Sequence, residues 1–162
     1  RARVTEAIAA VGLEDCVERP VHALSHGQKK RLCIAGVLAM KPEVLLLDEP
    51  MAGLDAAMQA EFAALLAKLH AGGMTIIVAT HDLDFAYRWA DTLHVLAAEH
   101  RVASWKAAAL EGSLEDLARL GLGTPGVAEL HRQLVEAGVL PEGEPPPRSQ
   151  EALSKRLDAL KK

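Results

Sequence analysis

Residues 24–55 read LSHGQKKRLCIAGVLAMKPEVLLLDEPMAGLD, and the organisation of the rest of the chain follows from this segment. Ser25, with Gln28 three residues later and an apolar run behind it, has the pattern of a capping box, which predicts a helix that begins at Ser25 and ends before Pro42. The first turn of a helix carries unpaired backbone amides, and Gly27 lets a ligand approach them closely. These residues therefore fit a phosphate site, although a plain capped helix explains LSHGQ at least as well.

The second half of this segment predicts a strand that ends in two acids. Residues 44–47 are a short apolar run after a proline, which is typical of a strand buried on both faces of a parallel sheet. Asp48 and Glu49 follow at its carboxyl end, where open α/β sheets bind ligands. Because neighbouring strand residues point to opposite faces, one carboxylate can hold a metal ion while the other is aimed at a water. Two solvated acids at the start of a loop are the alternative interpretation.

Four motifs, in this order and at this spacing, resemble those of the ATP-binding subunits of ABC transporters. The motifs are LSHGQ at 24–28, similar to the signature motif; VLLLDEP at 44–50, similar to the Walker B strand; AGLD at 52–55, similar to the D-loop; and Thr80-His81-Asp82, similar to the switch histidine. Each motif is weak alone, but their combination is highly specific. The resemblance implies an α/β fold, the three-layer P-loop NTPase core of an ABC ATPase with a parallel sheet.

Composition limits the other classes of function. The chain has 162 residues, half of them apolar, with a net charge of -4, which suits one compact domain with an appendage. No run of about 20 apolar residues occurs, so we expect a soluble chain that is not exported. The only basic cluster, residues 29–31, reads as a solvated helix face, which argues against nucleic acid as the main partner. Cys16 and Cys33 read as reduced thiols, with Cys33 in the core.

The P-loop, a glycine-rich turn that ends in Gly-Lys-Ser/Thr, is not found in these 162 residues. The chain begins at Arg1 without methionine, and residues 3–12 have the apolar spacing of a helix that packs on something. We therefore expect a fragment in which the N-terminal part of the ATPase domain is absent. Residues 1–104 would be the C-terminal portion of that domain, and this fragment alone is expected neither to bind ATP tightly nor to hydrolyse it.

Strands and helices alternate after the D-loop. The pattern predicts a helix over 58–69, a strand over 75–79, a helix capped by Asp82, and a strand over 93–97 in the same parallel sheet. His81 then lies just past a strand end, on the sheet edge that carries the two acids. A lone histidine there is usually a structural residue, and only the preceding motifs favour a catalytic one. The turn near His100 lacks glycine, which leaves its type open.

Residues 105–162 read as a small helical tail. Helix starts are predicted at Ser113 and before Val127, a Pro-rich linker at 141–147, and a last helix at 149–160. Apolar stripes on the tail helices would either cover the sheet of the same chain or pair two subunits, and the resemblance implies the second, a dimerisation region. The stripes are Leu130 and Leu134 on one helix and Leu153, Leu157 and Leu160 on the other.

The tail and the signature motif narrow the resemblance. His26 stands where most of these transporters have glycine, and with the segment VAEL at 127–130 and the proline break it resembles the cobalt and nickel importer ATPases of the energy-coupling-factor type. The seven histidines show no metal-ligand spacing, so no metal store is predicted. The implied protein hydrolyses ATP at the cytoplasmic face of the cell membrane to energise import of cobalt or nickel. Its implied partners are a second copy and integral membrane transport subunits, without nucleic acid.

The resemblance also implies a role for each matching residue, with ATP and Mg²⁺ as cofactors. Across the dimer, the signature residues Ser25, His26, Gly27 and Gln28 would bind the nucleotide at its γ-phosphate. Asp48 would hold Mg²⁺ through water, Glu49 would accept the proton of the attacking water, and His81 would contact the γ-phosphate and hold that water in line. Asp55 would connect the two nucleotide sites.

Two other functions stay open from the sequence. One is an ABC-type ATPase outside transport, such as a DNA-repair or translation ATPase, which the lack of a coiled-coil insertion and of a basic stripe makes less favoured. The other is an inert dimerisation or regulatory fragment, which the missing P-loop would explain. Nucleotide binding separates the second from an intact enzyme.

Overall fold

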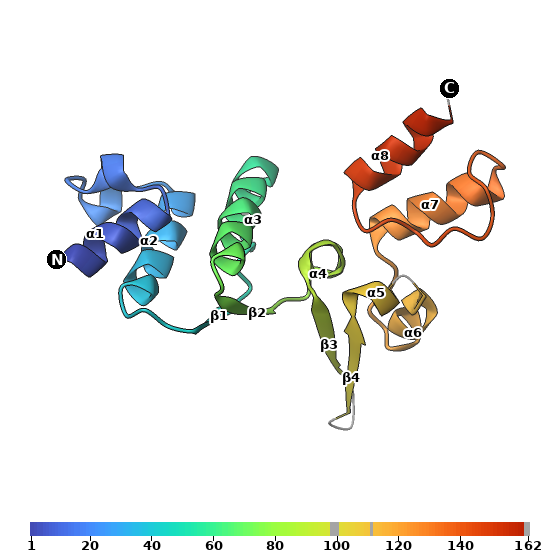
Figure 1. Cartoon of the computed structure of the whole chain (residues 1–162), viewed down its shortest axis with the longest axis horizontal. Helices are drawn as coiled ribbons and strands as arrows, with labels where there is room; N and C mark the ends of the chain where they lie inside the picture. The colour runs from blue at the N-terminus through green and yellow to red at the C-terminus, as the bar shows by residue number, and fades with distance from the viewer. Residues whose placement is uncertain (98–100, 111, 161–162) are drawn as a thin grey trace. The chain divides into compact units, whose positions relative to one another are not determined.

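The computed structural model describes residues 1–97, 101–110 and 112–160, which form two compact units (Figure 1). The first unit comprises Arg1–Thr80 and the second His81–Lys162. The boundary that we predicted after residue 104 separates the ATPase portion of the chain from the helical tail, and it stays a prediction. Among the described residues, no helix combines the length and the apolar character needed to cross a membrane.

The first unit begins with a helical layer. It consists of α1 (Ala2–Ala10), two short 3-10 turns, η1 (Glu14–Cys16) and η2 (Val21–Ala23), and α2 (His26–Leu38). Helix α1 packs against α2, and Val11, Leu13 and Ile34 are among the buried residues of this layer. Gly12 follows α1 with φ of 68°, a left-handed conformation in which glycine avoids the steric cost of a side chain. The predicted helix at 3–12 is therefore present.

Cys33 corrects one prediction, because its side chain is exposed rather than part of the core. It lies on α2 in an exposed stripe with Lys29 and Gly36, whereas Ile34 beside it is buried. Residues spaced by three and four along a helix share one face, so Cys33 lies on the same solvent-exposed face as Lys29. An apolar run along the sequence did not reveal which face of the helix packs.

The rest of the first unit is a strand–helix–strand element. Strand β1 (Val44–Asp48) pairs in parallel with β2 (Thr75–Ala79), and α3 (Ala56–Ala71) connects them. In the register, Val44 lies opposite Thr75 and Asp48 opposite Ala79. The parallel pairing confirms the predicted sheet.

The prediction that residues 44–47 form a strand buried on both faces of the sheet was wrong. Leu46 is 70% exposed and Ile77 is 51% exposed, whereas Leu45 is buried. Helix α3 contacts β2, and its Phe62 and Leu66 are buried. One connecting helix can cover only one face of a sheet, so within the described part of this unit the strand pair is buried on one side.

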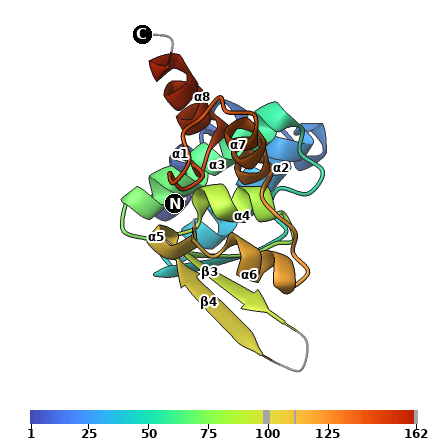
Figure 2. The same ribbon diagram turned by 90° about the vertical axis from the view of Figure 1, so that its right-hand side faces the viewer.

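The second unit is built on a short helix and a β-hairpin. Helix α4 (Leu83–Trp89) leads to β3 (Thr92–Leu96), which pairs antiparallel with β4 (Val102–Lys106), as the strands side by side in Figure 2 show. We predicted that 93–97 would join the parallel sheet, and this was wrong. The two hairpin strands are separated by too few residues for a crossover connection, which parallel pairing needs. The turn near His100 lies outside the described residues.

The described part of the second unit continues with the helices α5 (Ala107–Leu110), α6 (Leu114–Arg119), α7 (Gly126–Glu136) and α8 (Gln150–Ala159). Ser149 caps α8 by accepting a hydrogen bond from the amide of Ala152 at 3.1 Å, which confirms the predicted start of the last helix. Buried apolar residues from the described strands, helices and loops of the second unit pack into one cluster: Tyr87, Val95, Leu110, Leu117, Val127, Leu140 and Leu153.

The Pro-rich segment 141–147 is anchored rather than free. The hydroxyl of Tyr87 donates to the carbonyl of Pro146 at 3.3 Å. Directly after the segment, the guanidinium of Arg148 donates to the carbonyls of Tyr87 at 2.7 Å and Ala90 at 2.6 Å, and lies 5.8 Å from the centre of the Tyr87 ring. The segment therefore returns the chain onto α4 and places α8 against α7.

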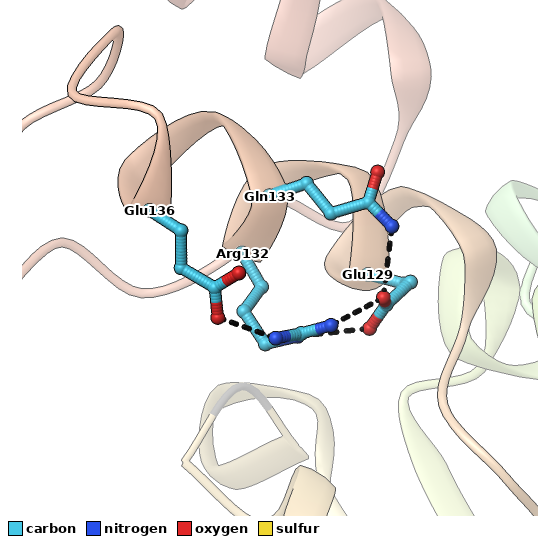
Figure 3. A network of polar contacts seen from close by, with 4 residues as sticks. All are labelled: Glu129, Arg132, Gln133 and Glu136. Carbon is cyan, nitrogen blue, oxygen red and sulfur yellow. Dashed lines mark hydrogen bonds and ion pairs between the residues drawn. The ribbon is translucent and has the colours of Figure 1, made fainter.

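The outer face of α7 carries a charged network (Figure 3). Arg132 donates to Glu129 at 3.0 Å from Nε and pairs with Glu136, while Gln133 donates to Glu129 at 3.0 Å. Arg132 lowers the pKa of Glu129, chiefly by hydrogen bonding. Pairs as exposed as these contribute little to stability, so this face of α7 is a solvated one and the opposite face packs.

His131 lies on that opposite face and predicts a pH-dependent stability. It is 5% exposed, and burial lowers its pKa, helped by the positive charge of Arg156 and opposed by Glu144. Since a histidine with a depressed pKa takes up a proton on unfolding, the second unit should be fully stable above the unfolded pKa of about 6.5 and lose stability as the pH falls below it.

The expected result is a fall of a few degrees in the melting temperature of the second unit between about pH 7.5 and pH 5.5. His131→Gln cannot ionise and should flatten this dependence, whereas His94→Gln, on an exposed histidine of the same unit, should keep it. Tryptophan fluorescence is a suitable measurement, because both tryptophans, Trp89 and Trp105, belong to this unit. An unchanged pH dependence in His131→Gln would show that other groups cause it.

Candidate functional site

The turn that starts α2 has the predicted capping box. The amide of Gln28 donates to Ser25 Oγ at 3.2 Å, and the amide of Ser25 donates to Gln28 Oε1 at 2.9 Å. The first-turn amides of α2 therefore point outward from the N-terminal end of the helix, which is the arrangement that binds anions. The capping interactions are confirmed, whereas phosphate binding by Ser25, Gly27 and Gln28 stays a prediction.

Gly27 has a packing role that the sequence did not reveal. A Cβ atom at this position would lie 3.3 Å from Sδ of Met58 on α3, which is closer than most side-chain contacts. The glycine thus lets α2 and α3 approach each other. His26, also predicted to bind nucleotide, is exposed, and its Nε2 lies 3.5 Å from the point where a Cβ would stand on Gly53. The signature turn and the D-loop are therefore neighbours in this unit.

The strand-end acids differ in conformation. Asp48 is the last residue of β1 and is exposed. Glu49 has φ of 42°, a left-handed conformation that costs a residue with a side chain about 1–2 kcal/mol. Because the strand geometry ends at Asp48, the alternation of directions that we predicted does not extend to Glu49.

Glu49 is nevertheless held by the neighbouring strand. Its amide donates to the carbonyl of Ala79 at 2.9 Å, and its carboxylate accepts a hydrogen bond from Thr80 Oγ1 at 3.0 Å. Two bonds to one segment fix the strained backbone and orient the side chain. We did not predict the part played by Thr80, although the parallel register indicates it, since Thr80 follows the residue opposite Asp48.

Asp55 caps α3, since its Oδ1 accepts a hydrogen bond from the amide of Met58 at 2.8 Å. A structural role therefore accounts for its carboxylate in this unit, and the predicted role between nucleotide sites stays a prediction. Asp82 likewise caps α4 by accepting from the amide of Phe85 at 2.9 Å, as predicted.

Residues 29–31 are not a uniformly solvated face, so this prediction was wrong. Lys29 is exposed. Lys30 is partly buried, which lowers its pKa, and its ammonium donates to the carbonyls of Pro50 at 2.7 Å and Ala52 at 2.6 Å. Arg31 pairs with Glu61 on α3. Two of the three cations thus connect α2 to the D-loop and α3.

An open hollow of about 200 Å³ lies where α2 meets α3. Its lining combines signature residues with the start of α3: Ser25, Gly27, Gln28, Arg31, Leu54, Met58, Glu61 and Phe62. The structure therefore brings the signature turn next to the helix that Asp55 begins.

Two predicted site residues depend on arrangements beyond the first unit. His81 is the first residue of the second unit and is exposed, so its approach to Glu49 stays a prediction. Asp48 offers one exposed carboxylate, which suits Mg²⁺, an ion that keeps several waters and takes one or two carboxylates beside substrate phosphates. No group of three or more His, Cys, Asp or Glu side chains that could hold a metal occurs among the described residues.

The first 52 residues match a family model described as ABC transporter. The chain is 46% identical over 160 residues to the cobalt import ATP-binding protein of Rhodobacter capsulatus, covering 99% of this chain and 55% of that protein. It is 56% identical over 101 residues to an energy-coupling factor transporter ATP-binding protein of Carboxydothermus hydrogenoformans, covering 62% of this chain and 37% of that protein.

A solved structure gives the same result. The chain aligns with cbiO1 of Clostridium perfringens, described as part of the ABC transporter complex cbiONQ, with 40% identity and a TM-score of 0.65. The alignment covers 82% of this chain and 53% of that one. The chain spans about half the length of the curated relatives it matches over most of its own length.

Proposed function

Because the chain belongs to the ATP-binding proteins of ABC transporters, of the energy-coupling-factor type, we propose that it is part of a subunit that hydrolyses ATP to energise import of a transition-metal ion, cobalt or nickel. The observation that carries this proposal is the fixed Glu49 at the end of β1, in the same unit as a capped, phosphate-compatible helix start. The name of the Rhodobacter relative favours cobalt as the substrate.

Each site residue takes part in positioning or proton transfer. The carboxylate of Glu49, oriented by Thr80, accepts a proton from the attacking water. Asp48 would hold Mg²⁺ through water, and the bound ion would supply positive charge that stabilises the phosphates in the transition state. His81 contacts the γ-phosphate and keeps the water in line with Glu49. Phosphoryl transfer depends mainly on such positioning and charge stabilisation.

The signature turn serves a second nucleotide. Ser25, Gly27 and the first amides of α2 bind the γ-phosphate of ATP held by the partner subunit, with His26 at the same turn and Gln28 holding the cap. Asp55, at the start of α3, lies on the segment that connects the two sites. The active form is therefore a pair of ATPase subunits that closes over two ATP molecules.

We propose integral membrane transport subunits as the other partners, with the ATPase pair at the cytoplasmic face of the membrane. The relative from Clostridium is described as part of the ABC transporter complex cbiONQ, which supports this proposal. The helical tail is proposed to join the two ATPase subunits through its exposed leucines, since Leu130 is 44% and Leu160 is 54% exposed. Leu153 is buried within its own chain and cannot serve in that contact as the unit stands.

Reconstitution of the complete subunit with its membrane partners in vesicles tests the proposal. ATP supplied on the cytoplasmic side of the vesicle membrane should drive accumulation of Co²⁺ or Ni²⁺ on that same side. The subunit should release phosphate in a Mg²⁺-dependent manner at the same time. Phosphate release without uptake of either ion would favour another substrate or an ABC ATPase outside transport. No nucleotide binding by the complete subunit would favour a dimerisation or regulatory role.

A further inference from the structure

Lys30 is placed between two groups that the proposed function uses separately. It lies on α2, in the turn after the signature residues, and its ammonium contacts the loop 50–54. That loop joins Glu49, the proposed base, to Asp55 at the start of α3. The two donor–acceptor distances, 2.7 Å to the Pro50 carbonyl and 2.6 Å to the Ala52 carbonyl, are those of strong, charge-assisted hydrogen bonds.

The carbonyls of Pro50 and Ala52 accept from Lys30, whereas the carbonyls that alternate with them, those of Glu49 and Met51, accept hydrogen bonds from amides of the loop itself. The amide of Ala52 donates to the Glu49 carbonyl at 3.2 Å, and the amide of Leu54 donates to the Met51 carbonyl at 3.2 Å. Met51 and Leu54 are buried and anchor the loop by their side chains. The ammonium thus fixes the other side of the loop, directly after Glu49.

The other contacts between α2 and this region lie farther along the chain from Glu49, and the first of them is made by His26, whose Nε2 lies 3.5 Å from the point where a Cβ would stand on Gly53. Arg31 pairs with Glu61, in the second turn of α3, and Gly27 lies against Met58 in the first. None of these contacts reaches the residues that immediately follow Glu49. Lys30 therefore makes the contact through which a displacement of α2 reaches the strained residue at the strand end.

We propose that Lys30 is a positioning residue that makes the signature turn move as one body with Glu49 and the loop 50–54 that follows it. The inference rests on the proposed function, in which Ser25 serves the nucleotide of the partner subunit and Glu49 serves the nucleotide of its own. Closure of the signature turn on one ATP then orients the base at the other. Lys30 thereby couples two hydrolysis sites without touching either substrate.

Lys30→Met in the complete subunit tests the proposal, because methionine keeps an unbranched apolar stem and removes the donor. Turnover should fall by about 10- to 100-fold, the scale of a small misplacement of reacting groups, while the affinity for ATP stays near the parent value. Lys30→Arg, which keeps a charged donor, should recover most of the turnover. Lys29→Met, on the exposed neighbouring lysine, is the matched control and should behave as the parent.

Amide hydrogen exchange on the chain itself separates this inference from the proposed function. In Lys30→Met the amides of Ala52 and Leu54 should exchange faster than in Lys29→Met, whether or not the subunit hydrolyses ATP. A parent subunit without ATPase activity would refute the proposed function, and exchange would still decide the role of Lys30 in holding the loop. Unchanged exchange, parental turnover, or an equal loss of ATP affinity and turnover in Lys30→Met would each overturn the positioning role.

Discussion

Glu49→Gln in the complete subunit should lower ATP turnover by about 10²- to 10⁴-fold, the usual contribution of a general base. The amide has the shape of the carboxylate and keeps an oxygen that accepts the hydrogen bond of Thr80, so the geometry of the site is retained. It cannot take a proton from water. ATP binding should therefore survive, and the closed pair of subunits should accumulate with ATP between them.

Phosphate release and equilibrium binding of a fluorescent ATP analogue measure the two effects separately. Glu43→Gln is the matched control, because Glu43 is an exposed glutamate directly before β1 whose backbone carbonyl, not its side chain, accepts a hydrogen bond from the amide of Thr75. It should retain the parent turnover. Turnover near the parent rate in Glu49→Gln would show that Glu49 is not the base, and an equal loss of binding would show that its carboxylate holds the fold of the site.

Local patterns were sufficient for the elements that position the site. The capping box of Ser25 and Gln28, the apolar strands β1 and β2, and the cap of α4 by Asp82 are encoded within a few residues, and the structure contains each of them. Parallel pairing followed from the alternation of strands and helices. Identification of the family depended on four such short motifs in order, and the comparisons confirmed it.

The features that were missed depend on partners distant in the sequence. Strand β4 is a short segment with no glycine turn before it, so nothing local distinguished the β3–β4 hairpin from another strand of the parallel sheet. Lys30 has the composition of a surface lysine, and only the fold places carbonyl groups of a loop 20 residues away beside it. Thr80 gains its role from strand register rather than from its neighbours. Chemistry at this site thus combines local motifs with contacts that tertiary structure supplies.

The second large effect is expected in the tail. Leu153→Ala should destabilise the second unit by about 2–5 kcal/mol, the range for removing a buried leucine side chain. Leu153 on α8 is 2% exposed and packs in the cluster that includes Tyr87, Val127 and Leu140. For a unit of this size each kcal/mol corresponds to about 4–8 °C, so the melting temperature should fall by about 10 °C or more. Leu122→Ala, at a position of the same unit that is 40% exposed and lies outside the proposed dimer contact, is the control and should change little.

Melting curves at several protein concentrations distinguish two roles of α8, namely packing on its own chain and completing the core of a partner subunit. Both tryptophans lie in the second unit, so their fluorescence follows its unfolding alone. If α8 packs on its own chain, as Leu153 and Arg148 indicate, the loss in Leu153→Ala will be the same at every protein concentration. If α8 instead completes the core of a partner subunit, Leu153→Ala will weaken the association itself, so the loss in melting temperature that it causes will change with protein concentration, because association stabilises by mass action. That second result would contradict the in-chain core and make the tail an exchanged dimer element, whereas the first leaves dimerisation to the exposed Leu130 and Leu160.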